Sequence, residues 1–263
     1  MTRVRLAAGV LVAGLALFIF PHAPACAEEL MILTVGGNLY ALEVPATTAA
    51  PTKLLSGLEK VRLFERVGRM IVTLSEDGRL EQFEPSGAAR RSVGSTPYRD
   101  VRFLVEVCGR LVLAGENIVV VDPASGEHRI ICPARDLRIV TSCGGALLAL
   151  SADNALVRID LGSGARKVLF SDPRLGKIGV LAALEDRLFG VDRHGVLLEL
   201  TPGGGTFRRV LGPTTGLSYC ELLAGRAGAL WMVTHWGNLY RIDPDRGTAD
   251  LLSHDWINAC SIR

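Results

Sequence analysis

Three histidines and one aspartate in the C-terminal third of the chain have side chains that could support chemistry. His194, His235 and His254 stand in polar, loop-like segments, and Asp255 directly follows the last of them. Neutral imidazole nitrogens and a carboxylate are suitable ligands for zinc or another transition metal, and imidazole also exchanges protons near neutral pH. The set therefore predicts, as one alternative, the site of a hydrolase or lyase.

Two tryptophans accompany these histidines. Trp236 directly follows His235, and Trp256 directly follows Asp255. Exposed tryptophan is a frequent anchor at interfaces, so the same segments also fit a binding surface for a protein or an extended ligand. A third interpretation is a solvated loop face with Trp256 packed beneath it. We expect both tryptophans in one sector of one face, with at least one accessible to solvent.

Arginine recurs at one position of three apolar segments, as their second residue: Arg62, Arg102 and Arg138. In three further segments we assign Gly179, Ser218 and Asn258 to that position. A guanidinium group near a core needs a partner, for which the candidates are Glu65, Glu106 and Asp136. The alternative is a basic rim that receives an anion, because the forked donors of arginine suit carboxylate or phosphate.

Other patterns of catalysis or cofactor binding are missing. The sequence holds no nucleotide-binding glycine loop, nucleophile elbow or CxxC pair. Five cysteines follow residue 27, so at least one has no partner within the chain: Cys108, Cys132, Cys143, Cys220 and Cys260. We expect mostly free, buried thiols, with one disulfide as the alternative, and we assign no catalytic residue, no metal and no cofactor.

Composition narrows the class of protein. Of 263 residues 49% are hydrophobic and 21% are charged, which excludes a disordered chain. The formal net charge is +2, and Arg3 and Arg5 account for it, which leaves 27 basic and 27 acidic residues in the remainder. A neutral domain has no field to gather nucleic acid, so we expect no nucleic-acid partner.

The first 27 residues have the layout of a secretory signal peptide. Arg3 and Arg5 precede an apolar run over residues 6–20, and Ala25-Cys26-Ala27 resembles a cleavage site. The run is short for a spanning helix, which needs ~20 residues. We expect cleavage before Glu28 and export to the periplasm or beyond the cell, with no membrane span afterwards. The alternatives are a lipoprotein attached through Cys26 and an uncleaved anchor.

The remainder, residues 28–263, repeats six times. Each copy begins with a glycine, asparagine or alanine, continues as an apolar strand and, in most copies, ends in a turn with an acid, a proline or a glycine. The copies are Gly37–Glu43, Gly78–Gly87, Asn117–Gly126, Ala155–Gly164, Gly195–Gly203 and Gly237–Pro244. Their last apolar residues are 38 to 42 positions apart. Internal repeats of this length are typical of propellers and solenoids.

Three further strands accompany each copy. An apolar run precedes it, and a short strand with a basic start follows in five copies: Lys53, Arg91, Arg129, Lys167 and Arg209. Charges there would protect the outer edge of each sheet. The fourth strand leads to the next copy, as in 61–67, 101–107, 137–143, 178–184 and 217–223, and residues 257–263 match it.

Four strands in each of six repeats predict an all-β, six-bladed β-propeller of antiparallel sheets. The C-terminal strand would complete blade 1 and close the ring. A β-sandwich is the alternative, but it does not explain the steady period. The repeat resembles those of the six-bladed propeller superfamily, and Gly37–Glu43 and Gly237–Asp243 resemble quinoprotein-type repeats. This resemblance implies the fold and no catalytic residue.

These observations favour a non-enzymatic, exported propeller that binds a protein partner or an extended ligand through its loop face. In a propeller, the loops that enter the innermost strands share one face with the loops between the second and third strands. The candidate residues on that face are Arg62, Arg102, Arg138, His194, His235, Trp236, His254, Asp255 and Trp256. Many unrelated functions use this fold, so the partner and the oligomeric state stay open.

Overall fold

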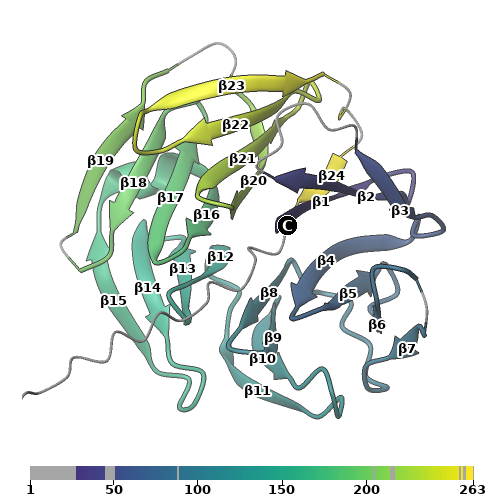
Figure 1. Cartoon of the computed structure of the whole chain (residues 1–263). Helices are drawn as coiled ribbons and strands as arrows, with labels where there is room; N and C mark the ends of the chain where they lie inside the picture. The colour runs from purple at the N-terminus through teal and green to yellow at the C-terminus, as the bar shows by residue number, and fades with distance from the viewer. Residues whose placement is uncertain are drawn as a thin grey trace, which may run out of the picture.

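The structure is a computed structural model, which describes residues 28–44, 51–87, 89–203, 205–213, 217–254, 256 and 259–262. The predicted signal peptide over residues 1–27, the candidate Asp255 and the expected position of Asn258 lie outside this part. Six four-stranded antiparallel sheets stand around a central axis (Figure 1). The chain is therefore a six-bladed β-propeller, as the repeats predict.

The first three blades hold the N-terminal half of the described chain. Blade 1 contains β24 (Ala259–Ile262), β1 (Glu28–Thr34), β2 (Leu39–Val44) and β3 (Thr52–Leu55). Blade 2 contains β4 (Val61–Val67), β5 (Met70–Ser75), β6 (Leu80–Phe83) and β7 (Arg91–Ser92). Blade 3 contains β8 (Phe103–Val107), β9 (Arg110–Ala114), β10 (Asn117–Val121) and β11 (His128–Pro133).

The other three blades follow in chain order. Blade 4 contains β12 (Leu137–Cys143), β13 (Ala146–Ser151), β14 (Ala155–Ile159) and β15 (Arg166–Ser171). Blade 5 contains β16 (Ile178–Leu184), β17 (Arg187–Asp192), β18 (Leu197–Thr201) and β19 (Thr206–Leu211). Blade 6 contains β20 (Cys220–Arg226), β21 (Ala229–Thr234), β22 (Leu239–Asp243) and β23 (Thr248–Ser253).

The two ends of the chain close the ring. The C-terminal strand β24 pairs antiparallel with β1, with Ile262 opposite Ile32 and Ser261 opposite Leu33. It thereby supplies the innermost strand of blade 1, as the sequence predicts. Pairing the two ends removes an open edge from this blade and ties the first and last repeats together.

Two innermost strands begin later than predicted, β8 at Phe103 in place of residue 101 and β20 at Cys220 in place of residue 217. Residues 217–223 were expected to form the innermost strand of blade 6, but β20 begins three residues later, at Cys220. Leu217 is instead a buried residue of the connection that enters the strand, with 1% of its surface exposed. Leu217 corresponds to Leu58 and Leu175, which lie three residues before β4 and β16 and are also buried. Its side chain is apolar because it packs into the core below this connection.

Helical structure is scarce in the described part. Its one helical segment is the 3₁₀ helix η1 (Pro173–Lys177), which Asp172 caps by accepting a hydrogen bond from the Arg174 amide. No helix among the described residues has the length and apolar character needed to cross a membrane.

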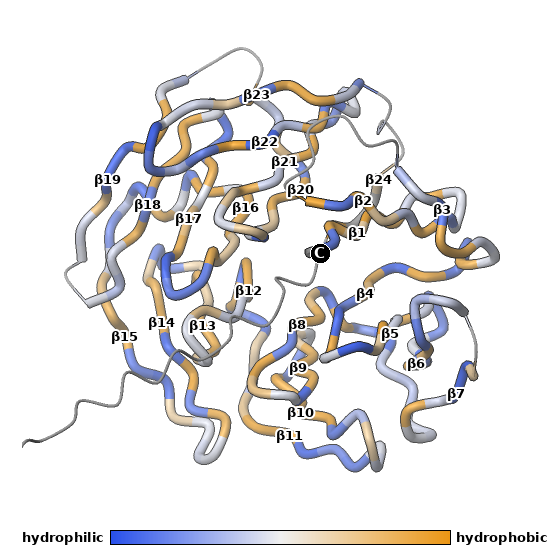
Figure 2. Tube along the Cα trace, in the orientation of Figure 1, coloured by the Kyte–Doolittle hydropathy of each residue, from blue (hydrophilic) through white to orange (hydrophobic). Residues whose placement is uncertain are grey.

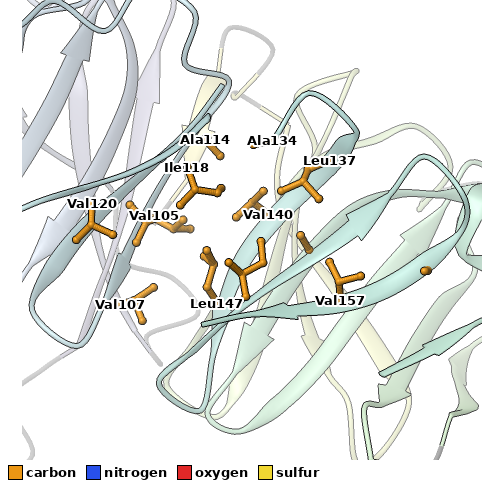
Figure 3. Packing of buried hydrophobic residues seen from close by; sticks show 14 residues of the cluster. Val105, Val107, Ala114, Ile118, Val120, Ala134, Leu137, Val140, Leu147 and Val157 are labelled. Atoms are coloured by element: carbon orange, nitrogen blue, oxygen red, sulfur yellow. The ribbon is translucent and has the colours of Figure 1, made fainter. Parts of the chain in front are cut away.

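The hydrophobic core lies between neighbouring blades, because both faces of each sheet are covered. Figure 3 shows the layer between blades 3 and 4, where Val105, Ile118 and Val120 face Val140 and Leu147. The second strands are nearly continuous apolar runs, as expected for strands buried on both faces. β5 and β9 accordingly carry the apolar colour along most of their length in Figure 2.

The acidic residues that end the third strands shape turns. Asp122 accepts hydrogen bonds from the amides of Ala124 and Ser125, at 2.8 and 3.1 Å. These bonds, led by that of Ser125, hold the pKa of Asp122 below its usual value. Asp243 does the same with the amides of Asp245 and Arg246, each at 3.0 Å. Turn formation, and not a shared calcium ion, thus explains these two carboxylates.

Glycines in the same turns let one blade touch the next. Gly126 has a φ of +75°, and a Cβ there would lie 2.5 Å from the Gly94 nitrogen in blade 2. Gly164 has a φ of +76°, and its Cβ would lie 2.6 Å from the Ile131 oxygen in blade 3. Both positions need glycine for conformation and for space.

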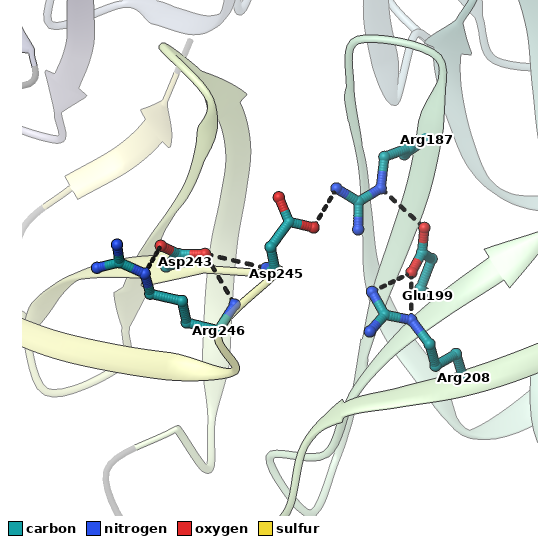
Figure 4. A network of polar contacts seen from close by, with 6 residues as sticks. All are labelled: Arg187, Glu199, Arg208, Asp243, Asp245 and Arg246. Carbon is teal, nitrogen blue, oxygen red and sulfur yellow. Dashed lines mark hydrogen bonds and ion pairs between the residues drawn. The ribbon is translucent and has the colours of Figure 1, made fainter.

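A polar network joins blades 5 and 6 (Figure 4). Arg187 donates to Glu199 within blade 5 and to Asp245 of blade 6, both at 2.8 Å. Arg208 lies 2.6 Å from the other carboxylate oxygen of Glu199. Only 17% of the Glu199 side chain is exposed, so this carboxylate is the best shielded member of the network.

Glu199→Gln should lower the free energy of unfolding at neutral pH by about 1 kcal/mol, because two charge-assisted contacts weaken. The Arg187 hydrogen bond, followed by that of Arg208, holds the pKa of Glu199 below its usual 4.5. A lowered pKa stabilises the fold above 4.5, and that contribution disappears as the pH falls through the lowered value. Thermal unfolding of wild type and variant at pH 7 and pH 3 should show a gap that narrows in acid. Glu116→Gln is the control, because its partner Arg135 is 76% exposed.

Candidate functional site

The recurrent arginines occupy an irregular position at the start of the innermost strands. In β4 the pairing register shifts between Val61 and Leu63, which leaves Arg62 as the extra residue of a β-bulge. Arg138 has the same place in β12. Arg102 directly precedes β8, and its amide donates to the Ala114 oxygen at 2.8 Å.

The register also corrects the assignment in other blades. The bulge of β16 holds Gly179, as the sequence indicated, but that of β20 holds Glu221 and not Ser218. In β24 the irregular residue is Cys260, between Ala259 and Ser261, and not Asn258. The late start of β20 explains the first error, since the sequence alignment was shifted by three residues.

Each of the three arginines donates to backbone carbonyl oxygens of the next blade. Arg102 reaches the oxygens of Ala134 and Leu137, at 3.2 and 2.9 Å. Arg138 reaches those of Leu175 and Ile178, at 3.4 and 2.8 Å. Both therefore bridge blades, but their acceptors are carbonyl groups and not the proposed carboxylates. Asp136 pairs instead with Arg166, at 2.7 Å.

Arg62 is the weakest of the three bridges. One terminal nitrogen donates to the Arg99 oxygen at 3.1 Å. Its Nε is buried and has no hydrogen-bond partner among the described residues, which costs free energy. All three side chains thus make the contacts between blades that the structural interpretation expects, and the anion-binding rim stays a prediction.

Two arginines at the outer edge use the same kind of acceptor. Arg129 of blade 3 donates to the Leu161 and Gly162 oxygens of blade 4, at 2.7 and 2.9 Å. Arg91 of blade 2 donates to the Pro123 oxygen of blade 3, at 3.4 Å. Two of the five predicted edge residues, Arg91 and Arg129, thus also hold neighbouring blades together.

Blade 6 has a different chemistry at the bulge. Glu221 replaces arginine there, and its carboxylate lies 2.6 Å from Nδ1 of His235. The His235 amide donates to the Tyr219 oxygen at 3.0 Å. The hairpin between β21 and β22 is therefore attached to the connection that enters β20.

Three rings gather at this point, and we call Tyr219, His235 and Trp236 the aromatic patch. Trp236 lies edge-to-face with both others, at centroid distances of 6.4 Å to Tyr219 and 5.4 Å to His235. Tyr219 and Trp236 are 64% and 62% exposed. Tyr219 also has a φ of +65°, an unfavourable value for a bulky residue. The fold holds two large aromatic side chains in solvent at some conformational cost.

The sequence did not single out Tyr219 or Glu221. A lone tyrosine near a turn carries no spacing signal. Glu221 does not stand out because the comparison of the repeats assigns Ser218, three residues earlier, to its position. Glu221 is the acidic exception to the arginine at the bulge, so a correct strand boundary would have revealed it.

The remaining candidates of this sector have different roles. His254 lies with Nδ1 2.8 Å from the Asn238 side-chain oxygen, in the same hairpin as Trp236. The Trp256 amide donates to the Gly237 oxygen at 2.9 Å, but its side chain is only 6% exposed. Trp256 packs edge-to-face on Tyr40, at 5.5 Å. One tryptophan is thus accessible and the other supports the loop from beneath.

His194 stands in the hairpin between β17 and β18. Its amide donates to Asp192 at 2.8 Å, and its ring lies 3.4 Å from Nε of Arg193. Within the described ranges, no three His, Cys, Asp or Glu side chains are grouped closely enough to hold a metal ion. The three histidines therefore do not form a shared metal site there, and Asp255 lies outside those ranges.

Four free thiols are described, but only Cys143 is a buried residue and Cys108 is an exposed one, which corrects the expectation of mostly buried thiols. Cys108, Cys132, Cys143 and Cys220 are free, and the side chain of Cys260 lies outside the described part. Burial raises the pKa of Cys143 and of Cys220 above the usual value, which keeps both thiols protonated and poorly reactive near neutral pH.

Comparisons with known proteins show the fold alone. No protein-family model and no curated protein matches the sequence. The structure is similar to PorZ, a surface component of the type-IX secretion system of Porphyromonas gingivalis, with a TM-score of 0.60 and 15% identity over 82% of this chain. The match covers 30% of the PorZ chain. It is also similar to virginiamycin B lyase from Staphylococcus aureus, with a TM-score of 0.57 and 16% identity over 84% of this chain and 82% of the lyase.

Arg102→Met should lower the free energy of unfolding by about 1–3 kcal/mol, because the carbonyl oxygens of Ala134 and Leu137 lose their charged hydrogen-bond donor. Arg62→Met should cost less, since Arg62 makes a single such bond. Urea unfolding of wild type and both variants measures the two losses in free energy of unfolding and shows which is larger. Arg135→Met, on an exposed pair, is the matched control. A loss for Arg102→Met no larger than that for Arg135→Met would show that the bridges do not stabilise the ring.

Proposed function

We propose that this propeller is a binding module that docks a protein partner on the aromatic patch. The carrying observation is the contact between the exposed rings of Tyr219 and Trp236. Tryptophan and tyrosine are the side chains most enriched at the energetic centres of interfaces, because they bury much area with few rotatable bonds. Six-bladed propellers in general serve as scaffolds for such surfaces.

The attachment of the patch supports this proposal. Its residues come from a connection and a hairpin that are joined by the bond between the His235 amide and the Tyr219 oxygen. His254 bonds to the same hairpin through Asn238. Loops fixed before binding lose less conformational entropy when a partner arrives. The surface is therefore prepared for docking.

The rim of the patch adds polar specificity. Glu221 and His235 form a close pair whose side chains are 45% and 61% exposed. A partner that covers Trp236 would cover this pair as well, and a complementary basic group opposite Glu221 would favour its approach. For the hydrolase or lyase alternative, the similarity to virginiamycin B lyase supports a shared fold at 16% identity, and the described histidines form no cluster of metal-ligating side chains.

Export belongs to the same proposal. It rests on the charged start, the apolar run and the Ala25-Cys26-Ala27 segment of the N-terminal 27 residues. PorZ, a protein of similar fold, is a bacterial surface component. A periplasmic or extracellular partner fits a protein that reaches this compartment.

Trp236→Ala should weaken partner binding by about 30-fold, the equivalent of ~2 kcal/mol for an interface tryptophan, without changing the melting temperature. The measurement is quantitative capture from the envelope fraction, followed by titration of the partner obtained. Ile130→Ala is the matched control, because Ile130 is 63% exposed on an outer strand. Equal binding by Trp236→Ala would refute the patch, and turnover of a small molecule by the pure protein would favour the enzyme alternative.

The exported protein should begin at Glu28. Intact mass and N-terminal sequencing of the secreted chain measure this directly. A chain that begins at Cys26 with added lipid mass would establish the lipoprotein, and a chain that keeps residues 1–27 would establish the anchor.

A further inference from the structure

A cavity of about 370 Å³ lies on the axis of the propeller, at the end of the ring opposite the aromatic patch. Its wall comes from the ends of β4, β8, β12, β16 and β20 and from the turns that follow β8, β12 and β16. This volume is at the lower end of the range of small-molecule sites. The cavity therefore has room for a metabolite-sized ligand and not for a folded partner.

The wall carries charged residues on both sides, and small alanine residues on one of them. One side is formed by Glu65, Arg66, Glu106, Thr141 and Ser142, of blades 2 to 4. Glu65 is only 7% exposed, and its Oε1 accepts a hydrogen bond from the Arg66 amide at 3.0 Å. The opposite side, of blades 5 and 6, combines small residues such as Ala182, Ala183 and Ala224 with the charged Glu185 and Arg226.

Four charged side chains of the wall are not paired with one another. Within the described chain, Arg66, Glu106, Glu185 and Arg226 make no ion pair among themselves. Glu106 accepts one bond, from the Gly109 amide, and Nε of Arg66 donates to the Gly68 oxygen at 3.2 Å. Charged groups of both signs thus line one cavity, and they retain donors and acceptors that could bind a ligand.

Their order around the ring separates the signs. Arg66, Glu106, Glu185 and Arg226 belong to blades 2, 3, 5 and 6. In a ring of six, blade 2 lies opposite blade 5 and blade 3 lies opposite blade 6. Each arginine therefore has one glutamate across the axis and another on a neighbouring blade, with Arg66 beside the blade of Glu106 and Arg226 beside the blade of Glu185.

We propose that this axial cavity binds a small zwitterion, an α-amino acid in chemical class. Its carboxylate would accept from the guanidinium group of Arg226 or Arg66, and its ammonium group would donate to Glu106 or Glu185. Thr141 and Ser142 supply neutral hydrogen-bonding groups beside them. A ligand with one charge satisfies only half of this arrangement, whereas a zwitterion satisfies both halves.

The cavity and the aromatic patch are separate sites. Arg226 ends β20 and precedes β21, whereas His235 follows the end of β21. Six residues of extended chain lie between them, a distance of about 20 Å. Loss of one binding activity therefore need not alter the other.

The test is calorimetric titration of the mature chain with each free L-amino acid, at concentrations up to about 10 mM. We expect one or a few amino acids to bind, and their N-acetyl and α-amide derivatives to bind at least about tenfold more weakly. Glu106→Gln and Arg226→Met should each lower the affinity at least about tenfold. Glutamine at 106 can still accept from the Gly109 amide, and Arg226 has no side-chain partner in the described chain, so both variants should fold.

Matched controls are Glu116→Gln and Arg135→Met, which change the same residue types on the outer surface. These variants and Trp236→Ala should bind the amino acid like wild type. Failure of the aromatic patch to bind a protein would leave this result unaffected. The proposal is overturned if no amino acid binds at 10 mM, or if binding is equal in wild type and in both cavity variants.

Discussion

Hydrogen bonding and packing between neighbouring blades is the constraint on which this structure depends. A single four-stranded sheet here has two apolar faces, so no blade can be stable in water without a blade on each side. The layer between blades 3 and 4 is typical, with valine, isoleucine and leucine side chains of both sheets in contact. Burial of this kind is non-directional. Something else must fix how the blades stand relative to each other.

Directional hydrogen bonds near the axis and at the outer edge fix the position of each blade relative to the next. Near the axis, Arg102 and Arg138 each donate to two carbonyl oxygens of the next blade. At the outer edge, Arg129 does the same, and Gly126 and Gly164 allow the turn backbones to approach. Guanidinium suits this task because it is always charged and presents several donors in fixed directions. The arginines are thus explained by the geometry of the ring.

The bulge at the start of the innermost strand shows how function can use a structural position. An extra residue in a strand re-aims its side chain. In blades 2 and 4 that side chain is an arginine that bridges blades, and in blade 6 it is Glu221, which pairs with an exposed histidine. Blade 6 therefore has no arginine at its bulge to donate hydrogen bonds to the next blade. The polar network of Arg187, Glu199 and Asp245 lies at the other interface of this blade, between blades 5 and 6.

Most of the fold could be predicted from the sequence, because the repeat period of about 40 residues and the apolar runs of the buried strands are both visible in the sequence. The predicted innermost strands 61–67, 137–143 and 178–184 agree with β4, β12 and β16. β20 was misplaced because Leu217 is apolar for a different reason, as a buried residue of a connection.

The site was less accessible to prediction. The arginines were assigned carboxylate partners, and a sequence does not show that a backbone carbonyl of another blade lies within reach. The exposed pair of Tyr219 and Trp236 depends on a contact between two loops, which strand patterns do not encode. By contrast, the gathering of Trp236, His254 and Trp256 followed from equivalent loops alone.

The innermost strands finally explain why one small domain can present two unlike surfaces. β20 begins beside the aromatic patch, with Glu221, and ends at the axial cavity, with Arg226. Its middle is fixed by pairing with β21, with Leu223 opposite Met232 in the core. Side chains at the two ends are exposed to solvent or to the cavity, so they can change without loss of core area. Sites this far apart that share no partner contribute nearly additively to stability, which leaves each end of the ring free to acquire its own chemistry.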